Sequence, residues 1–264
     1  MYTFSYQKPS SVADAVAVLT GDDDAKAVAG GMTLIPTLKQ RLAQPSALVD
    51  LGSVPGLTGI RRDGDALVIG AMTTHATVAA DATVRSALPA LAALAGGIGD
   101  PAVRHRGTCG GSVANADPAA DYPAAVVGLG ATVITDRREI AGDDFFTGLF
   151  ETALEPGELI TALRFPLPKR AGYAKFRNPA SRYAVVGVMV AETAAGIRVA
   201  VTGAGPSVFR VAAMEQALNA SFTAAALEGI SVDAGDLNTD LHASAEYRAH
   251  LVTVMARRAV EAAR

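Results

Sequence analysis

The chain has 264 residues, enough for one large domain or two modest ones, and half of them are hydrophobic, so a buried core is expected. Charged residues make up 19% and the formal net charge is −3, which gives no electrostatic argument for binding nucleic acid or an anionic membrane surface. A single cysteine excludes an internal disulfide framework and an iron–sulfur cluster held by this chain alone. We find no apolar run of membrane-spanning length and no signal-peptide core, and therefore expect a cytoplasmic protein without a transmembrane segment.

The N-terminal region predicts a small α/β unit. Residues 10–19 have the spacing of a short amphipathic helix. A strand over 26–31 runs into a Gly-Gly pair, a helical stretch follows over 32–43, and 47–51 forms a second strand. This order of strand, glycine turn, helix and strand is typical of a βαβ layer, so a first subdomain is predicted over about residues 1–55.

A second subdomain is predicted over about residues 56–168. Residues 57–73 predict two strands around a turn at Asp63-Gly64. An alanine-rich helical region, interrupted at Pro89, follows over 77–99. After a glycine- and proline-rich stretch, residues 122–135 predict a helix that leads into a strand.

The segment "PLPKRAG" is the best candidate for a domain boundary, because two prolines close the strand before it. We place the division between a first domain, residues 1–168, and a second, residues 169–264. Alternating apolar residues between 173 and 205 predict strands of an antiparallel sheet, and a last helix is predicted from about Ala245.

Two Gly-Gly pairs carry the strongest chemical signal. They lie in "AGGMTLIP", Ala29–Pro36, and in "TCGGSVAN", Thr108–Asn115. A Gly-Gly pair after a strand permits positive φ and close approach of a ligand, and successive amides can then point at one anion. Hydroxyl residues flank both pairs: Thr33 in the first, Thr108 and Ser112 in the second. Together they predict a divided grip on an extended diphosphate, although the absence of a Gly-x-Gly-x-x-Gly pattern disfavours a standard Rossmann fold.

The chain resembles a known family over essentially its whole length. The segments "AGGMTLIPTLKQRLAQPSALVDL", "IGDPAVRHRGTCGGSVANADPAADYPAAVVGLGA" and "EPGELITALRFP" are similar to the flavoprotein, or medium, subunit of molybdenum hydroxylases, of the carbon monoxide dehydrogenase type. The segments "GAGPSVFRV" and "AEYRAHLVTVMARRAV" resemble the C-terminal domain of that subunit. The resemblance implies an α+β protein: an FAD-binding fold of the PCMH/vanillyl-alcohol-oxidase type with two α/β subdomains, then a domain of antiparallel sheet plus helices.

The resemblance also implies the residues that contact FAD. By position they are Ala29, Gly30, Gly31, Met32, Thr33 and Leu34 in the first segment, Thr108, Cys109, Gly110, Gly111 and Ser112 in the second, and Asp121, Lys175 and Tyr183. The family often has a polar residue in place of Met32, which puts a side-chain contact there in doubt but leaves the backbone contact. Cys109 replaces a usual isoleucine, and we interpret it as a small buried apolar residue, with a redox-sensitive thiol as the alternative.

Several of these positions have a plainer alternative. Asp121 lies near the flavin or caps the helix that follows it. Asp117 has the same two alternatives, and a cap or turn is favoured for it. Lys175 supplies a cation that stabilises reduced flavin, and Tyr183 lies against the flavin ring, or both are ordinary strand residues. Arg104 and Arg106 donate to carbonyls of their own loop or face a partner.

The function implied by the resemblance is that of an FAD-carrying electron-transfer subunit. The expected partners are a large subunit with the molybdenum-pterin cofactor and a small subunit with [2Fe–2S] clusters, assembled as a dimer of heterotrimers, and an external electron acceptor. The chain itself would have no catalytic residue and no metal. A peripheral association with the inner membrane through the complex is an alternative to a purely cytoplasmic location.

Two other functions remain open from the residues alone. A standalone flavin oxidase often tethers its FAD through a histidine, but the four histidines here match no tethering motif; they are His75, His105, His242 and His250. A non-catalytic nucleotide- or phosphate-binding module would also use glycine turns of this kind.

Overall fold

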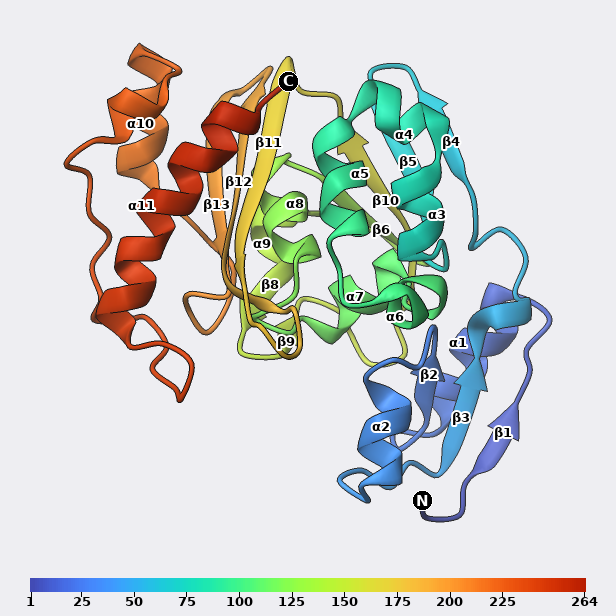
Figure 1. Ribbon diagram of the computed structural model, residues 1–264. Helices are drawn as coiled ribbons and strands as arrows, with labels where there is room; N and C mark the ends of the chain where they lie inside the picture. Colours follow the sequence, from blue (N-terminus) through green and yellow to red (C-terminus); the bar gives the residue numbers. More distant parts are fainter.

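Three β-sheets of three to five strands follow one another along the chain in the computed structural model, which describes residues 1–264. A fourth, two-stranded sheet consists of β8 (Phe146–Gly148) and β9 (Glu151–Thr152). A three-stranded sheet at one end is followed by a five-stranded sheet and a four-stranded sheet, as Figure 1 shows. Helices cover the sheets and fill the space between them (Figure 1). No helix combines the length and the apolar character that crossing a membrane would require.

The first sheet is parallel, with strand order β1-β3-β2. The βαβ prediction is confirmed, because β2 and β3 pair in parallel and a short helix lies between them in the chain. Strand β1, which the sequence pattern did not indicate, pairs with the other edge of β3. Helix α1 begins after Ser11, whose side chain accepts a hydrogen bond from the amide of Asp14. The elements are β1 (Ser5–Gln7), α1 (Val12–Gly21), β2 (Lys26–Val28), α2 (Leu34–Lys39), β3 (Ala47–Asp50) and the 3-10 helix η1 (Leu51–Ser53).

The second sheet is antiparallel, with strand order β4-β5-β10-β6-β7. The alanine-rich region before its third strand breaks at Asp81 as well as at the predicted Pro89. Asp81 ends one helix and caps the next by accepting from the amide of Val84. The elements are β4 (Ile60–Asp63), β5 (Ala66–Gly70), α3 (His75–Ala80), α4 (Ala82–Ala87), α5 (Pro89–Gly96), α8 (Tyr122–Gly128), β6 (Thr132–Thr135), β7 (Glu139–Ala141), α9 (Gly142–Phe145), β8 (Phe146–Gly148), β9 (Glu151–Thr152) and β10 (Ile160–Pro166).

The glycine- and proline-rich stretch between α5 and α8 is helical rather than a loop. It contains α6 (Pro101–Arg106) and α7 (Cys109–Asn115). Asp100 caps α6, with Pro101 at the first helical position, where its missing N–H costs nothing. The second glycine pair lies in the first turn of α7, and neither glycine has a positive φ. The prediction of a glycine turn after a strand is therefore wrong for this pair.

The third sheet is antiparallel, with strand order β11-β12-β13-β14. Helix α11 packs on β11 and β12, while α8, from the preceding part of the chain, also packs on β12 and β13. Strand β12 is buried along almost its whole length, which explains why it reads as the unbroken apolar run "AVVGVMVA" rather than alternating. The elements are β11 (Arg170–Arg177), β12 (Ala184–Thr193), β13 (Gly196–Thr202), β14 (Phe209–Arg210), α10 (Ala212–Ala220), η2 (Ala224–Leu227) and α11 (Ala245–Ala262).

Three separate hydrophobic clusters form the interior. Ten buried residues pack around the first sheet, 28 around the second and 19 around the third. The middle cluster takes in Met189 and Ala191 of β12, and the first takes in Met72 and Leu159 from the second sheet region. Neighbouring sheet regions therefore contribute residues to the same cluster, while each sheet retains a core of its own.

Candidate functional site

A cavity of about 550 Å³ lies where the three sheet regions meet. Its lining comes from the segment after β2, from the helix pair α6 and α7, from the start of α8 and from the turn before β12. Every predicted site residue except Cys109 and Lys175 lines it. The volume falls within the range of ligand pockets in proteins, about 300–1,000 Å³.

The first glycine segment presents unused backbone donors to this cavity. The amides of Gly30, Gly31, Met32 and Thr33 donate to no other group of the chain. Gly31 has φ +70°, so the backbone bends in a way that most residues avoid. Successive free amides around such a bend form a concave site for an anion.

The second glycine segment works differently from the predicted nest. The amide of Cys109 donates to the carbonyl of Thr73 at 3.1 Å and that of Gly110 to Ala71 at 2.9 Å. The amide of Gly111 donates to Thr108 Oγ1 at 3.1 Å. These amides are satisfied within the protein, so the segment can offer a ligand its hydroxyls and its small size rather than a row of free N–H groups.

Close packing explains why glycine is required at these positions. A Cβ on Gly110 would lie 2.4 Å from the Cβ of Ala71. A Cβ on Gly30 would lie 2.1 Å from the carbonyl oxygen of Arg106, and one on Gly111 would lie 3.1 Å from the Cβ of Ala29. The two glycine segments therefore contact each other directly and hold the first sheet region against the second.

A buried ion pair lies at another part of the cavity wall. Lys175 Nζ lies 2.9 Å from the carboxylate of Asp121, and the two side chains are only 3% and 4% exposed. The hydroxyl of Tyr173 donates to the same carboxylate. Burial raises the pKa of Asp121, and Lys175 opposes this shift. Burial also raises the pKa of Tyr173 well above its usual value, so Tyr173 remains a neutral donor.

These contacts rule out one of the alternatives for Asp121 and show the surroundings of Lys175. Asp121 stands at the position before α8 but makes no side-chain capping bond, so the capping interpretation is wrong. Lys175 does not line the cavity and lies behind Asp121 as its counter-charge. Tyr173 is the third member of this group. The sequence did not indicate its role in the site, because it lies in an ordinary strand pattern.

The remaining predicted positions have simpler environments. Cys109 is fully buried, its Sγ lies 3.3 Å from the carbonyl of Gly70, and burial raises the pKa of its thiol to about 12. It is therefore a protonated, buried side chain, as the first interpretation has it. Asp117 accepts from the amide of Ala119 in a turn, and Arg104 donates to loop carbonyls, as expected. Tyr183 is 43% exposed at the cavity edge.

His75 lines the cavity and was not assigned to it by sequence. Its side chain is 4% exposed, its Nδ1 has no hydrogen-bond partner, and its ring lies 5.4 Å from that of Tyr122. The backbone amide of His75 donates to the carbonyl of Gly107, directly before the second glycine segment. Burial, reinforced by the charge of Arg104, lowers the pKa of His75 from 6.5 to about 4.

The buried His75 makes the stability of the chain depend on pH. The unfolded chain binds a proton at pH 6.5 and the folded chain only near pH 4, so folding stability is lost as the pH falls through this window. Between pH 7.5 and pH 5 the free energy of unfolding should fall by roughly 2 kcal/mol more in the parent chain than in His75→Gln. Urea unfolding at both pH values measures this difference. The exposed His242→Gln should behave like the parent, and an equal pH response in parent and His75→Gln would contradict the assignment.

A further stretch of the cavity wall was missed by sequence reasoning. It consists of Leu154 and the run Glu158–Ile160, from the connection after β9 to the first residue of β10. The segment "EPGELITALRFP" is part of the resemblance, but no residue in it has a chemical pattern that points to a ligand. Its place in the cavity follows from the pairing of β10 with β5 and β6, which no local pattern reveals.

Comparisons with known proteins agree along the whole chain. Residues 2–168 match the family described as the FAD binding domain in molybdopterin dehydrogenase, and residues 171–263 match the CO dehydrogenase flavoprotein C-terminal domain. The chain is 38% identical to the nicotine 6-hydroxylase medium subunit of Paenarthrobacter nicotinovorans, over 97% of this chain and 95% of the relative. It is 39% identical to the carbon monoxide dehydrogenase medium chain of Afipia carboxidovorans, over 99% of this chain and 97% of that one.

The fold leads to the same relatives. Carbon monoxide dehydrogenase from Hydrogenophaga pseudoflava contains a chain that superposes with a TM-score of 0.90 at 35% identity, covering 99% of this chain and 97% of that chain. The predicted α+β fold, an FAD-binding domain followed by a C-terminal domain, is thereby confirmed. Because both family matches and the full-length relatives point the same way, this chain belongs to the FAD-binding medium subunits of the molybdenum hydroxylases.

Proposed function

We propose that FAD lies across the cavity with its diphosphate on the amides of Gly30 to Thr33. The observation that carries this placement is the set of four successive unused amides on the cavity wall. A diphosphate is the dianionic middle of FAD and needs several donors, which these amides supply without a charged side chain. Thr108 and Ser112 line the same cavity, and their hydroxyls would add donors from the opposite segment.

The ring end of FAD would lie near Asp121 and Tyr183. Both line the cavity on the side of the third sheet. Tyr183 has the exposure needed to pack against a ligand ring, and Asp121 can accept a hydrogen bond from a ring N–H while Lys175 balances its charge. Lys175 would thus act on the flavin through Asp121 rather than by direct contact.

The residues present fit FAD on physical grounds. The cavity has a suitable size, and its glycine segments leave no room for side chains. It combines the free amides of the first glycine segment with apolar lining side chains against which a ring can pack, among them Leu51, Leu154 and Leu159. We propose that the FAD-binding domain spans residues 1–168, with subdomains of about 1–55 and 56–168, and that residues 169–264 form the C-terminal domain.

The biochemical role that we propose is electron transfer within a complex. When bound, FAD supplies the chemistry of exchanging electrons singly or in pairs. Electrons would arrive from [2Fe–2S] clusters on a small subunit, fed by a large subunit with the molybdenum-pterin cofactor, and leave to an external acceptor. The names of the relatives, medium chain and medium subunit, support membership of such an assembly, which we propose to be a cytoplasmic dimer of heterotrimers.

The placement predicts one noncovalently bound FAD per chain. Titration of the flavin-free chain, or of the assembled complex, with FAD should saturate at a ratio of one, as measured by the absorbance of the protein-bound flavin. Acid precipitation should release all of the yellow colour, because none of the four histidines lies in a tethering motif and His75, the histidine that lines the cavity, is buried. A chain that takes up no FAD alone or in its complex, or that retains colour after precipitation, would contradict the proposal.

A further inference from the structure

The cavity has an end that the placement of the diphosphate and the flavin ring leaves unassigned. From the second glycine segment, Gly110 is bonded to Ala71, and Ala71 in turn is bonded to Thr161, beside Ile160. Leu159, in the wall formed by Leu154 and Glu158–Ile160, belongs to the hydrophobic cluster around the first sheet, whereas Tyr183 is the last residue before β12 of the third sheet. If the flavin ring lies at Tyr183, as proposed above, the adenosine half of FAD is directed toward this wall.

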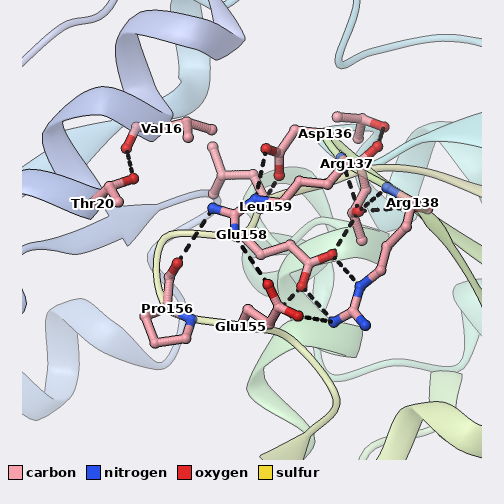
Figure 2. Close-up of polar contacts among 11 residues, drawn as sticks. Val16, Thr20, Asp136, Arg137, Arg138, Glu155, Pro156, Glu158 and Leu159 are labelled. Atoms are coloured by element: carbon pink, nitrogen blue, oxygen red, sulfur yellow. Dashed lines mark hydrogen bonds and ion pairs between the residues drawn. The ribbon is translucent and has the colours of Figure 1, made fainter.

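A carboxylate with no exposed surface holds this wall in place. Glu158 accepts from Arg138 Nε at 3.0 Å and from Nη2 at 2.9 Å, one bond to each carboxylate oxygen, as Figure 2 shows. Thr135 Oγ1 donates to it at 2.8 Å and the amide of Glu155 at 2.8 Å. A two-pronged bond between guanidinium and carboxylate fixes orientation as well as distance.

The turn between β6 and β7 provides further contacts to the same wall. Arg138 also donates to the carbonyl of Ala153 at 2.7 Å, and Arg137 to that of Pro156 at 3.3 Å. Asp136 accepts from the amide of Leu159 at 2.7 Å. Three consecutive residues of one turn thus bind both ends of the wall segment (Figure 2).

The charge of Glu158 is committed to this structure rather than to a ligand. Arg138 and the neighbouring hydrogen bonds lower the pKa of Glu158 from 4.5 to about 2, so the carboxylate stays ionised well below neutral pH. A free carboxylate facing a diphosphate ligand would repel it, whereas one that is paired with a guanidinium presents little net charge. The pair therefore gives the cavity a fixed wall without an electrostatic penalty for an anionic dinucleotide.

We propose that the Arg138–Glu158 pair positions the Leu154–Ile160 wall against the adenosine half of FAD and so makes this chain select FAD over FMN. Neither residue of the pair is proposed to take part in electron transfer. FMN lacks the adenosine half and should not sense the wall. This proposal depends on the placement of FAD given above.

The test compares the affinities of FAD and FMN in variants of the flavin-free chain, or of the complex if the isolated chain does not retain flavin. In Glu158→Gln, which keeps the shape but removes the charge, the affinity for FAD should fall about tenfold while that for FMN stays unchanged. Competition by ADP should weaken by a similar factor. Arg138→Lys keeps the charge but loses the planar fork, so it should show the same effect in smaller measure.

A matched control is available in the same sheet. Glu139 and Arg164 form another two-pronged ion pair, at 2.8 and 3.0 Å, which is partly exposed and lies outside the cavity. Glu139→Gln should leave the affinities for both flavins unchanged. Melting of each variant, followed by circular dichroism, identifies any that fail to fold, and Arg138→Lys then carries the test in place of Glu158→Gln.

The outcomes separate this proposal from the one it depends on. A parallel loss of FAD and FMN affinity in Glu158→Gln would show that the pair only stabilises the fold and would overturn the inference. An unchanged affinity for FAD would also overturn it. A parent chain that binds neither flavin, alone or in its complex, would instead refute the FAD placement itself.

Discussion

Replacing Gly30 by valine should reduce FAD affinity at least a hundredfold. The new Cβ would lie 2.1 Å from the carbonyl oxygen of Arg106 and 2.7 Å from the Cα of Gly107, which are backbone atoms that cannot rotate away. The two glycine segments would be forced apart, and the free amides would no longer face the hydroxyls across the cavity. Overpacking of this kind costs about 1–3 kcal/mol or more. Flavin titration and thermal unfolding of the variant measure both effects.

The variant should remain soluble, because the clash lies between two hydrophobic clusters and not within either of them. Gly21→Ala, at the end of α1, is the matched control, since its new Cβ would meet nothing within 4 Å. It should keep the parent affinity and stability. Full FAD occupancy in Gly30→Val would show that contact between the glycine segments is not needed for binding.

The second large effect is expected for Lys175→Met. This change removes the counter-charge of Asp121, whose side chain is only 4% exposed, and leaves Tyr173 as its remaining bonded partner. Breaking one side of a buried ion pair typically costs about 3–5 kcal/mol, because the remaining charge stays buried and uncompensated. Urea unfolding should show a loss of this size, together with weaker FAD binding.

Two further variants test whether burial of the Asp121–Lys175 pair causes the loss of stability in Lys175→Met. Adding Asp121→Asn to Lys175→Met removes the stranded charge and should recover most of the lost stability. Lys169→Met breaks an ion pair with Glu192 in which the lysine is 73% exposed, and it should cost less than about 1 kcal/mol. If Lys175→Met proved as mild as Lys169→Met, burial of the Asp121–Lys175 pair would not stabilise the fold by the expected amount.

Local patterns in the sequence were sufficient to predict much of the fold. The short helix near residues 10–19, the βαβ order of the first sheet and the Asp63-Gly64 turn depend on neighbours in the chain, and the structure confirms them. The resemblance supplied the family and therefore the arrangement of the domains. The break at Asp81 was missed because an aspartate within an alanine-rich run reads as a tolerated polar residue, until its carboxylate is seen to cap the next helix.

The site was less predictable because its contacts join distant segments. Tyr173 meets Asp121 across 52 positions of the chain, and Arg138 meets Glu158 across 20. Neither pairing has a sequence signature. The role of Gly110 was also misjudged, since what makes glycine necessary there is the approach of Ala71 rather than the conformation of the glycine itself. Sequence reasoning identified where small residues were needed, and only the tertiary packing explains why.

The separation of the interior into three hydrophobic clusters has a consequence for how the subunit responds to losing its cofactor. The proposed FAD site borders all three sheet regions. The ligand would therefore make contacts across the boundaries between the clusters and few contacts within any one cluster. A ligand stabilises the state that binds it. Removal of FAD should therefore weaken the packing between the clusters before any one cluster unfolds. Amide hydrogen exchange would then accelerate first at the glycine segments and the turn before β12, while the centre of β12 stays protected.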